Sequence, residues 1–288
     1  MKLPGLLLIL FLAAASRLPA QVTVEVALDQ DEFLPGEPLP ASVRITNRSG
    51  QTLHLGKEDD WLALSVESKD GYVVLRNGDI PVVGEFTLDS SMRAIKRVDV
   101  APHFNLIKPG RYSMQATVTI KEWDRQVTSK PKFFDIIQGA TKWEQEIGVP
   151  RAAGASNSVP EIRKYTLQEA NYLRHHLMLY FQLTDNSGKL NKVFPIGPML
   201  SFGQPEPQVD KWSNLHVLYQ NGPHSFNYTI IDPNGNVIGR QTYDFTTRPR
   251  LHPERDGSLT ISGGHRRLTS DDLPPSDVTE TNAATAKP

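Results

Sequence analysis

Hydrophobic and polar residues alternate along most of the chain beyond its first twenty positions. Val22, Val24, Val26 and Leu28 open this pattern with one apolar side chain at every second position. A period of two predicts a strand that buries one of its faces. Turn-forming Gly, Pro, Asn and Asp residues separate the alternating runs. The same period recurs over 39–45, 53–55, 62–66, 86–88, 98–100, 112–120 and 133–137. Residues 72–75, after the turn Lys69-Asp70-Gly71, are predicted to return as the hairpin partner of 62–66. Residues 21–140 are therefore predicted to form an antiparallel β-sandwich.

The second half of the chain shows the same period. Its longest alternating run places six side chains on one strand face: Leu173, His175, Leu177, Leu179, Phe181 and Leu183. Shorter runs follow over 193–196, 199–202, 215–219, 226–231, 237–245 and 259–261. No window has the capped, 3.6-residue period of a helix. The predicted fold class is therefore all-β, with a second β domain over 164–264 that is a β-sandwich or a blade-like sheet.

The first twenty residues have the pattern of a secretory signal peptide. Lys2 precedes an apolar run from Leu6 to Ala15, which is too short to span a bilayer, and Ala20 precedes a cut at Gln21. An uncleaved anchor or a buried N-terminal helix is the alternative. The signal peptide predicts export, and therefore a periplasmic or secreted protein with no membrane span after its removal.

Two further segments depart from the alternating pattern. Residues 151–158 are small, polar and aperiodic between two prolines, and they predict an interdomain linker over 141–163. Residues 265–288 are rich in Thr, Ser, Asp, Pro and Ala and have almost no apolar content. They are predicted to be a disordered tail whose removal leaves the melting temperature nearly unchanged.

Three short motifs in the first region resemble bacterial immunoglobulin-like modules. They are Phe33-x-Pro35-Gly36-Glu37-Pro38, Val43-x-Ile45-x-Asn47 and Pro109-Gly110-x-Tyr112. The resemblance covers residues 22–138. Modules of this kind occur in adhesion-type repeats and in the Bacillus-type proteinase-inhibitor domain. It implies an immunoglobulin-like sandwich and a role in interaction. No inhibitory loop can be matched, so the resemblance assigns no functional residue.

Composition limits the possible functions. The formal net charge is −1 and the chain has no cysteine. Disulfides, zinc-thiolate sites and thiol catalysis are therefore impossible, and the whole chain is not a strongly basic nucleic-acid binder. No nucleic acid is expected among its partners. Arg248, Arg250, Arg255, Arg266 and Arg267 form a loose basic stretch, interpreted as solvated surface with an anionic envelope polymer as the alternative.

No recognisable catalytic motif occurs. The single Ser-x-x-Lys match, Ser129 to Lys132, contains Pro131 and lies near a strand, whereas this chemistry needs a helical turn. His175 and His176 are neighbours on a strand and point to opposite faces, so they cannot share one metal ion. His175 is interpreted as a core histidine. The other histidines, at 54, 103, 216, 224, 252 and 265, are scattered. No catalytic or cofactor-binding residue is assigned, and no cofactor is expected.

Acidic loops leave open whether the protein binds a metal ion. Glu58-Asp59-Asp60 and the group Asp29, Asp31, Glu32 and Glu37 contain the oxygen ligands that calcium prefers, but solvated loops are the simpler interpretation. Asp232-x-Asn234-x-Asn236 imitates the start of a calcium loop. It lacks the later glycine and acid, so a hairpin turn is the preferred interpretation. The metal-binding residues are therefore unknown.

Aromatic residues provide a weaker indication of carbohydrate binding. The candidate stacking platforms are Trp61, Tyr72, Trp123, Trp143, Trp212 and Tyr219. Core packing is the usual role of such residues in β proteins.

The sequence as a whole favours an exported, non-catalytic binding module whose partner is an envelope or extracellular protein or glycan. The alternatives are a proteinase inhibitor built on the first domain, an enzyme whose site is assembled only in the fold, and an assembly subunit with an open edge strand.

Overall fold

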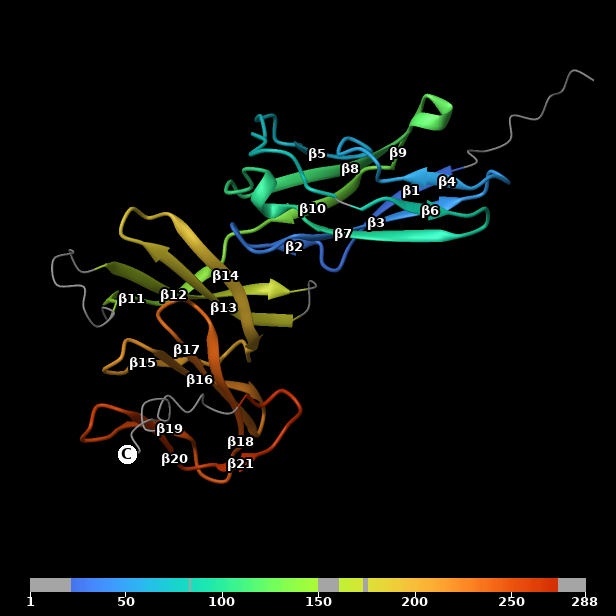
Figure 1. Ribbon diagram of the computed structural model, residues 1–288. Coiled ribbons are helices and arrows are strands. Elements are labelled where there is room, and N and C mark those ends of the chain that lie inside the picture. The colour runs from blue at the N-terminus through green and yellow to red at the C-terminus, as the bar shows by residue number, and fades with distance from the viewer. Residues whose placement is uncertain (1–21, 83, 150–160, 173–175, 274–288) are drawn as a thin grey trace, which may run out of the picture.

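The protein is built almost entirely from antiparallel β-sheets, as the computed structural model shows (Figure 1). The structure describes residues 22–82, 84–149, 161–172 and 176–273. The helical segments within these ranges are two single 3-10 turns, η1 (Ala101–His103) and η2 (Lys121–Trp123). The all-β prediction is therefore confirmed. Within the described ranges, no helix has the length and apolar character of a membrane span. The predicted signal peptide lies outside the described residues.

Two sheets packed face to face form the N-terminal sandwich, residues 22–137. The first sheet has the order β1-β3-β7, with β1 (Val22–Leu28), β3 (Pro40–Asn47) and β7 (Arg93–Asp99). The second has the order β2-β10-β8-β5, with β2 (Glu32–Phe33), β10 (Lys132–Ile136), β8 (Gly110–Ile120) and β5 (Leu62–Ser68). β9 (Arg125–Thr128) pairs with β8, and β4 (Leu53–Leu55) pairs with β6 (Phe86–Leu88).

The period of two explains the core of this sandwich. Val43 and Ile45 of β3 are fully buried and pack into the same cluster as Tyr112, Met114 and Val118 of β8. Each strand turns every second side chain inward, so two facing sheets enclose one apolar layer.

A second pair of facing sheets forms the C-terminal sandwich, residues 140–273. One sheet has the order β11-β12-β13-β14, with β11 (Ala140–Gly148), β12 (Ile162–Tyr172), β13 (His176–Asp185) and β14 (Leu190–Pro198). The other has the order β15-β16-β17-β18-β21, with β15 (Glu206–Val209), β16 (Leu215–Gly222), β17 (Ser225–Ile231), β18 (Val237–Asp244) and β21 (His265–Arg267).

β16 is buried on both of its faces. Leu215 and Val217 pack into the inter-sheet core with Phe181 of β13. On the other face, Leu218 packs with Leu251 of the hairpin β19 (Arg250–Pro253) and β20 (Leu259–Ser262). The hairpin thus adds a third layer over part of the second sheet, which explains why β16 is apolar at successive positions.

The structure corrects the predicted limits of the second domain. The predicted linker 141–163 contains most of β11, which pairs with β12 over eight positions, and only residues 150–160 lie outside the description. The predicted disordered tail begins with β21, and Leu273 exchanges backbone hydrogen bonds with Arg240. Both segments were missed because most of their side chains are exposed, so the sequence there has no clear alternation of apolar and polar residues.

One predicted hairpin in the first region is also wrong. Residues 72–75 do not pair with β5, whose partner is β8. They lie instead beside residues 104–108, through a bridge between Arg76 and Phe104.

A small apolar contact joins the two sandwiches. Leu34, in the turn after β2, packs against Ala170, Tyr180 and Val193 on the outward face of the first C-terminal sheet. Gly36 in this turn has φ +77°, and a Cβ there would clash with the end of the Leu190 side chain. Glycine therefore suits both the backbone conformation and the close approach.

A buried carboxyl group lies at the same contact. Glu37 accepts hydrogen bonds from the Leu34 amide at 2.8 Å and from Gln30 Nε2 at 3.0 Å, and its side chain also bonds to Tyr180. Burial nevertheless raises the pKa of the Glu37 carboxyl above its usual range, because desolvation outweighs these hydrogen bonds.

Phe181→Asp is expected to prevent folding of the C-terminal sandwich, because Phe181 is fully buried and the new carboxylate would have no partner in the core. Circular dichroism and soluble yield measure the effect. His176→Asp changes an exposed position of the same strand and is the control that should fold. A soluble, cooperatively melting Phe181→Asp protein would contradict the packing described here.

Glu37→Gln is expected to reduce the loss of unfolding free energy that the wild type shows as the pH rises from 4.5 to 7.5. A carboxyl group with a raised folded-state pKa stabilises the fold in its protonated form. That contribution is complete below the ordinary value of 4.5 and is lost as the pH rises through the folded-state pKa. Gln stays neutral, so the variant should gain stability relative to the wild type as the pH rises. Urea unfolding from pH 4.5 to 7.5 measures this difference.

The matched control is Glu67→Gln, which changes a carboxylate that is 68% exposed and should leave the pH profile parallel to that of the wild type. Parallel profiles for Glu37→Gln and the wild type would show that the Glu37 carboxyl does not titrate differently on folding.

Candidate functional site

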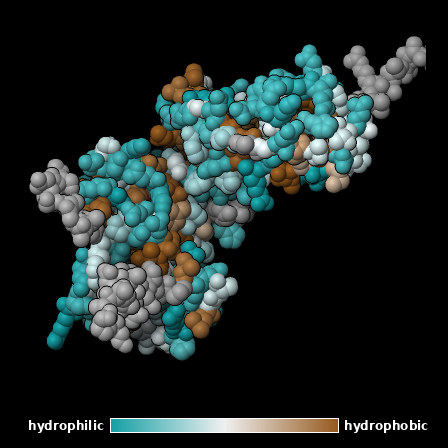
Figure 2. Space-filling view, in the orientation of Figure 1, coloured by the Kyte–Doolittle hydropathy of each residue, from teal (hydrophilic) through white to brown (hydrophobic). Residues whose placement is uncertain are grey.

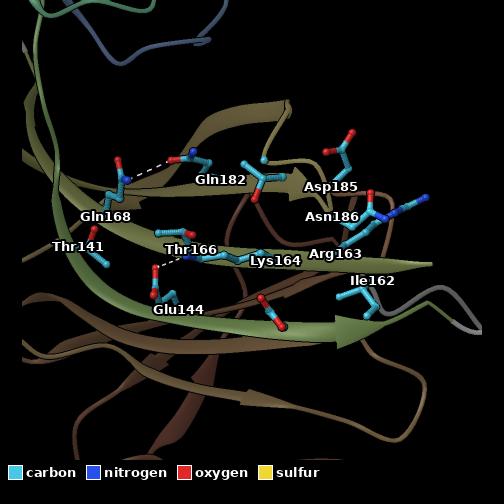
Figure 3. Close-up of a pocket in the computed structure, with 13 residues that line it drawn as sticks. Thr141, Glu144, Ile162, Arg163, Lys164, Thr166, Gln168, Gln182, Asp185 and Asn186 are labelled. Carbon is cyan, nitrogen blue, oxygen red and sulfur yellow. Dashed lines mark hydrogen bonds and ion pairs between the residues drawn. The ribbon is translucent and has the colours of Figure 1, made fainter. Parts of the chain in front are cut away.

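A hollow of about 380 Å³ lies on the outward face of β11, β12 and β13 (Figure 3). We call it the polar hollow, and its lining is dominated by side chains that form hydrogen bonds or carry charge. These are Thr141, Glu144, Glu146, Arg163, Lys164, Thr166, Gln168, Gln182, Thr184, Asp185 and Asn186. Ile162 and Gly188 complete the lining. The inward face of the same strands is apolar, so the two faces of this sheet differ sharply in chemistry.

Strand register places these side chains in rows across the sheet. Glu144 lies opposite Thr166, which lies opposite Gln182. In the next row, Lys164 lies between Glu146 and Thr184. Residues directly opposite each other on antiparallel strands share a face and have neighbouring Cβ atoms. Three hydrogen-bonded strands therefore hold the side chains of the polar hollow in fixed positions.

The polar hollow contains both paired and unpaired groups. Lys164 Nζ lies 2.6 Å from Glu144 Oε2, and Gln168 Nε2 donates to Gln182 Oε1 at 3.0 Å (Figure 3). Glu146, also on this face, makes no ion pair with any residue that the structure describes. Gln182 accepts through Oε1, so among the described residues both N–H groups of its side chain remain available to donate. The hollow can thus accept hydrogen bonds at carboxylates and donate them from an ammonium and an amide group.

The β13–β14 turn closes one end of the polar hollow. The Asp185 carboxylate accepts hydrogen bonds from Ser187 Oγ and from the Ser187 and Lys189 amides. The hydrogen bond from Ser187 Oγ is the main cause that holds the pKa of this carboxyl below its usual range. Asp185 is therefore ionised at neutral pH, and the lining carries three carboxylates against the ammonium of Lys164, since the Arg163 guanidinium binds the β17–β18 turn.

The same end of the sheet is tied to the opposite sheet. Arg163 Nη1 donates to the Pro233 carbonyl and to Asn234 Oδ1 in the β17–β18 turn. Lys192 Nζ donates to Asn236 Oδ1 of that turn at 2.6 Å. These contacts fix the polar hollow relative to the rest of the C-terminal sandwich.

A second depression, of about 540 Å³, lies on the N-terminal sandwich. Its lining is Thr46, Arg48, Ser91 and Arg93. Two guanidinium groups beside two hydroxyls suit an anion, but fewer side chains converge there than in the polar hollow.

The structure also assembles a buried triad of Asp210, His216 and Tyr228. His216 Nε2 lies 3.1 Å from Asp210 Oδ2, and His216 Nδ1 lies 2.5 Å from the Tyr228 hydroxyl. A carboxylate only accepts, so His216 donates from Nε2 to Asp210, while His216 Nδ1 and the Tyr228 hydroxyl share the second hydrogen bond. The side chains of Asp210 and His216 are 3% and 6% exposed, so the triad is closed to solvent.

The triad holds a loop in place. Asp210 accepts four hydrogen bonds, from the Trp212 and Asn214 amides, from Asn214 Nδ2 and from His216. Burial opposes ionisation, but the hydrogen bonds from His216 and Asn214 outweigh it and hold the pKa of the Asp210 carboxyl below its usual range. Ser213, at φ +66°, accepts from the Tyr165 hydroxyl and donates to the Gly148 carbonyl. Every polar group of the triad is used internally.

The sequence candidates for nucleophilic and metal chemistry lie apart. Ser129 is buried, and its hydroxyl accepts from the Ala116 amide, while Lys132 pairs with Asp31. His176 is exposed at the start of β13, and His175 lies outside the described residues. The part of the chain that the structure describes has no group of three or more His, Asp or Glu residues suited to a metal ion.

The acidic loops form ordinary ion pairs and turns. Lys121 pairs with both Glu58 and Asp60, and His54 lies 2.6 Å from Glu122. Asp232 Oδ1 accepts from the Asn234 and Asn236 amides. That pattern is a hairpin turn, as the sequence interpretation proposed.

The candidate aromatic platforms divide between core and surface. Trp61 and Tyr219 are buried, and Trp61 Nε1 donates to the Val82 carbonyl. Trp212 is 49% exposed, with Lys211 Nζ 4.3 Å from its ring. Of the basic stretch, Arg248 pairs with Glu206 and Arg267 with Asp244.

Comparison with known proteins gives no functional assignment. No protein-family model matches the chain, and no curated protein matches its sequence. The crystal structure of Spo0M, a sporulation control protein from Bacillus subtilis, is similar with a TM-score of 0.31 and 9% identity. That match covers 62% of this chain and 89% of Spo0M.

Sequence reasoning missed both the polar hollow and the buried triad. The only local signal for the hollow is the run of Glu and Lys on alternate positions of β11 and β12, which contains Glu144, Glu146 and Lys164. For the triad there is no such signal, since its members come from a loop and two strands.

Tyr228→Phe is expected to lower the free energy of unfolding by about 1–3 kcal/mol, because it leaves His216 Nδ1 buried without its hydrogen-bond partner. Urea denaturation measures the change. Tyr243→Phe is the control, since among the residues that the structure describes the Tyr243 hydroxyl donates to Gln241 on its own strand and to no buried group. Equal stabilities of Tyr228→Phe and the wild type would show that the Tyr228–His216 hydrogen bond does not contribute to the fold.

Proposed function

We propose that this chain is an exported, non-catalytic binding protein of the cell envelope or extracellular space, and that the polar hollow holds a hydroxyl-rich glycan segment. The observation that carries the proposal is the convergence of carboxylate, ammonium, amide and hydroxyl groups in one depression, on three strands of a rigid sheet. Rigid elements position binding groups more accurately than loops do.

The chemistry of the lining favours a neutral or amino-bearing glycan. Sugar hydroxyls both donate and accept, so Glu146 can accept from one hydroxyl while Lys164 and Gln182 donate to others. The excess of carboxylates disfavours an acidic polymer at this site. A protein partner from the same compartment is the alternative occupant.

Two further features support an interaction role. The pattern of residues 1–20 is that of a signal peptide, which supports export. Tyr112 donates to the Lys108 carbonyl at 2.7 Å, four residues upstream, as in the tyrosine corner of immunoglobulin-like sandwiches. This contact supports the immunoglobulin-like interpretation of the N-terminal sandwich, a fold used widely for binding.

The test is calorimetric titration of the chain with a panel of neutral, amino and acidic oligosaccharides. Lys164→Ala combined with Gln182→Ala should weaken binding of the best ligand about 30-fold, because two hydrogen bonds to the ligand are lost. Lys130→Ala with Gln126→Ala is the matched control on the N-terminal sandwich and should bind as the wild type does.

Equal affinities for the two double variants would place the ligand elsewhere. Cleavage of a bound oligosaccharide would show that the protein is an enzyme, and binding only to acidic oligosaccharides would contradict the charge argument.

A further inference from the structure

Three large apolar side chains project into solvent at one end of the N-terminal sandwich. Val73 is 84% exposed, Leu75 is 60% exposed and Ile107 is 65% exposed. Figure 2 shows hydrophobic surface projecting from the upper left of this sandwich, where the segment after β5 lies in Figure 1. Single exposed apolar residues are common on proteins, but a group of this kind marks an interaction surface.

The backbone gathers the three side chains into one group, which we call the apolar tip. The Asn105 amide donates to the Leu75 carbonyl at 2.9 Å, next to the antiparallel bridge between Arg76 and Phe104. Val74 and Leu106 pack into the core, so their neighbours Val73, Leu75 and Ile107 face away from it. Val73 and Leu75 are two positions apart and share a side of the extended chain.

Basic residues surround the apolar tip and lie on aromatic rings. Lys108 Nζ is 5.1 Å from the centre of the Tyr72 ring. Lys69 Nζ and the Arg111 guanidinium lie 5.9 Å and 5.4 Å from the centre of the Phe133 ring, and Phe133 is itself 41% exposed. Long cationic side chains in such positions can cover apolar surface and still reach polar headgroups.

The nearby acids leave two of these cations available. Glu67 pairs with Lys69 at 3.5 Å, and the Asp70 carboxylate accepts the backbone amide of Arg111. In the described part of the chain, the side chains of Lys108 and Arg111 form no ion pair. Both can therefore bind phosphate groups outside the molecule.

We propose that the apolar tip docks the protein on the surface of an anionic lipid bilayer. Val73, Leu75 and Ile107 enter the interfacial region, and Lys108 and Arg111 contact lipid phosphates. The combination of protruding apolar side chains with flanking cations matches the two attractions that hold peripheral proteins on anionic membranes.

A second copy of the chain is a poorer occupant of this surface. A standard protein interface buries roughly 800 Å² on each partner, far more than three side chains can supply. A bilayer needs no such complementary area, because each apolar side chain that enters it contributes separately. The inference does not depend on the glycan proposal, since the two surfaces lie on different sandwiches.

The test is flotation of the mature form, without residues 1–20, with vesicles of phosphatidylcholine alone or mixed equally with phosphatidylglycerol. The wild type should float with the anionic vesicles and less with the neutral ones. The triple variant Val73→Ser, Leu75→Ser, Ile107→Ser should partition about 30-fold more weakly. Lys108→Ala with Arg111→Ala should remove the preference for anionic lipid. In addition, Leu75→Trp should show a blue-shifted emission that brominated lipid quenches.

The matched control is Phe202→Ser with Leu268→Ser, which removes two side chains that are 76% and 78% exposed on the C-terminal sandwich. It should float as the wild type does. Circular dichroism should show all variants folded, because the changed side chains already face solvent. Equal flotation of the triple variant and the wild type would overturn the proposal. So would wild-type self-association in light scattering that the triple variant lacks, since the apolar tip would then join two chains.

Discussion

The arrangement of the two sandwiches depends on the outward face of the β11–β14 sheet. One part of this face packs against the N-terminal sandwich, and another part forms the polar hollow. Tyr180 and Gln182 are two residues apart on β13, so they lie on the same face. Tyr180 is buried under the turn after β2, where the N-terminal sandwich rests, while Gln182 lines the polar hollow. The strand period thus places the contact between the sandwiches beside the candidate site, on the same face of one sheet.

The sequence predicted the parts of the fold in which the period of two is expressed by apolar residues. β13 is the clearest example, because Leu179, Phe181 and Leu183 are all buried in the inter-sheet core. β11 was missed because polar or small residues fill its exposed positions, and Trp143 and Ile147 are the members of β11 that pack into the inter-sheet core. An alternating pattern reveals a strand only when apolar residues occupy its buried face at every second position. An edge strand with few apolar residues therefore escapes detection.

The predicted strand pairing was wrong in one place, because residues 72–75 are apolar at four successive positions and were predicted to be the hairpin partner of 62–66. β5 pairs instead with β8, and Tyr72 and Val74 pack against the core while Val73 and Leu75 remain in solvent. The polar hollow and the buried triad were beyond the sequence for a different reason. Their residues meet only through pairing register and loop geometry, which are set by contacts between distant segments. The hairpin interpretation of Asp232 to Asn236 succeeded because that turn is local.

The cross-links between the two C-terminal sheets are concentrated at one end. Arg163 and Lys192 bind the β17–β18 turn, and Ser213 binds Tyr165 and Gly148 nearby. At the opposite end, where Gly197 approaches Tyr219, the Leu200 amide just after β14 donates to the Gln220 carbonyl of β16, and Asn221 Oδ1 is buried without a hydrogen-bond partner among the described residues. Side-chain hydrogen bonds therefore fasten the two layers of the C-terminal sandwich more firmly at one end than at the other. Thermal breathing would part the layers first at the end with fewer side-chain links, and backbone amides there would exchange with solvent sooner.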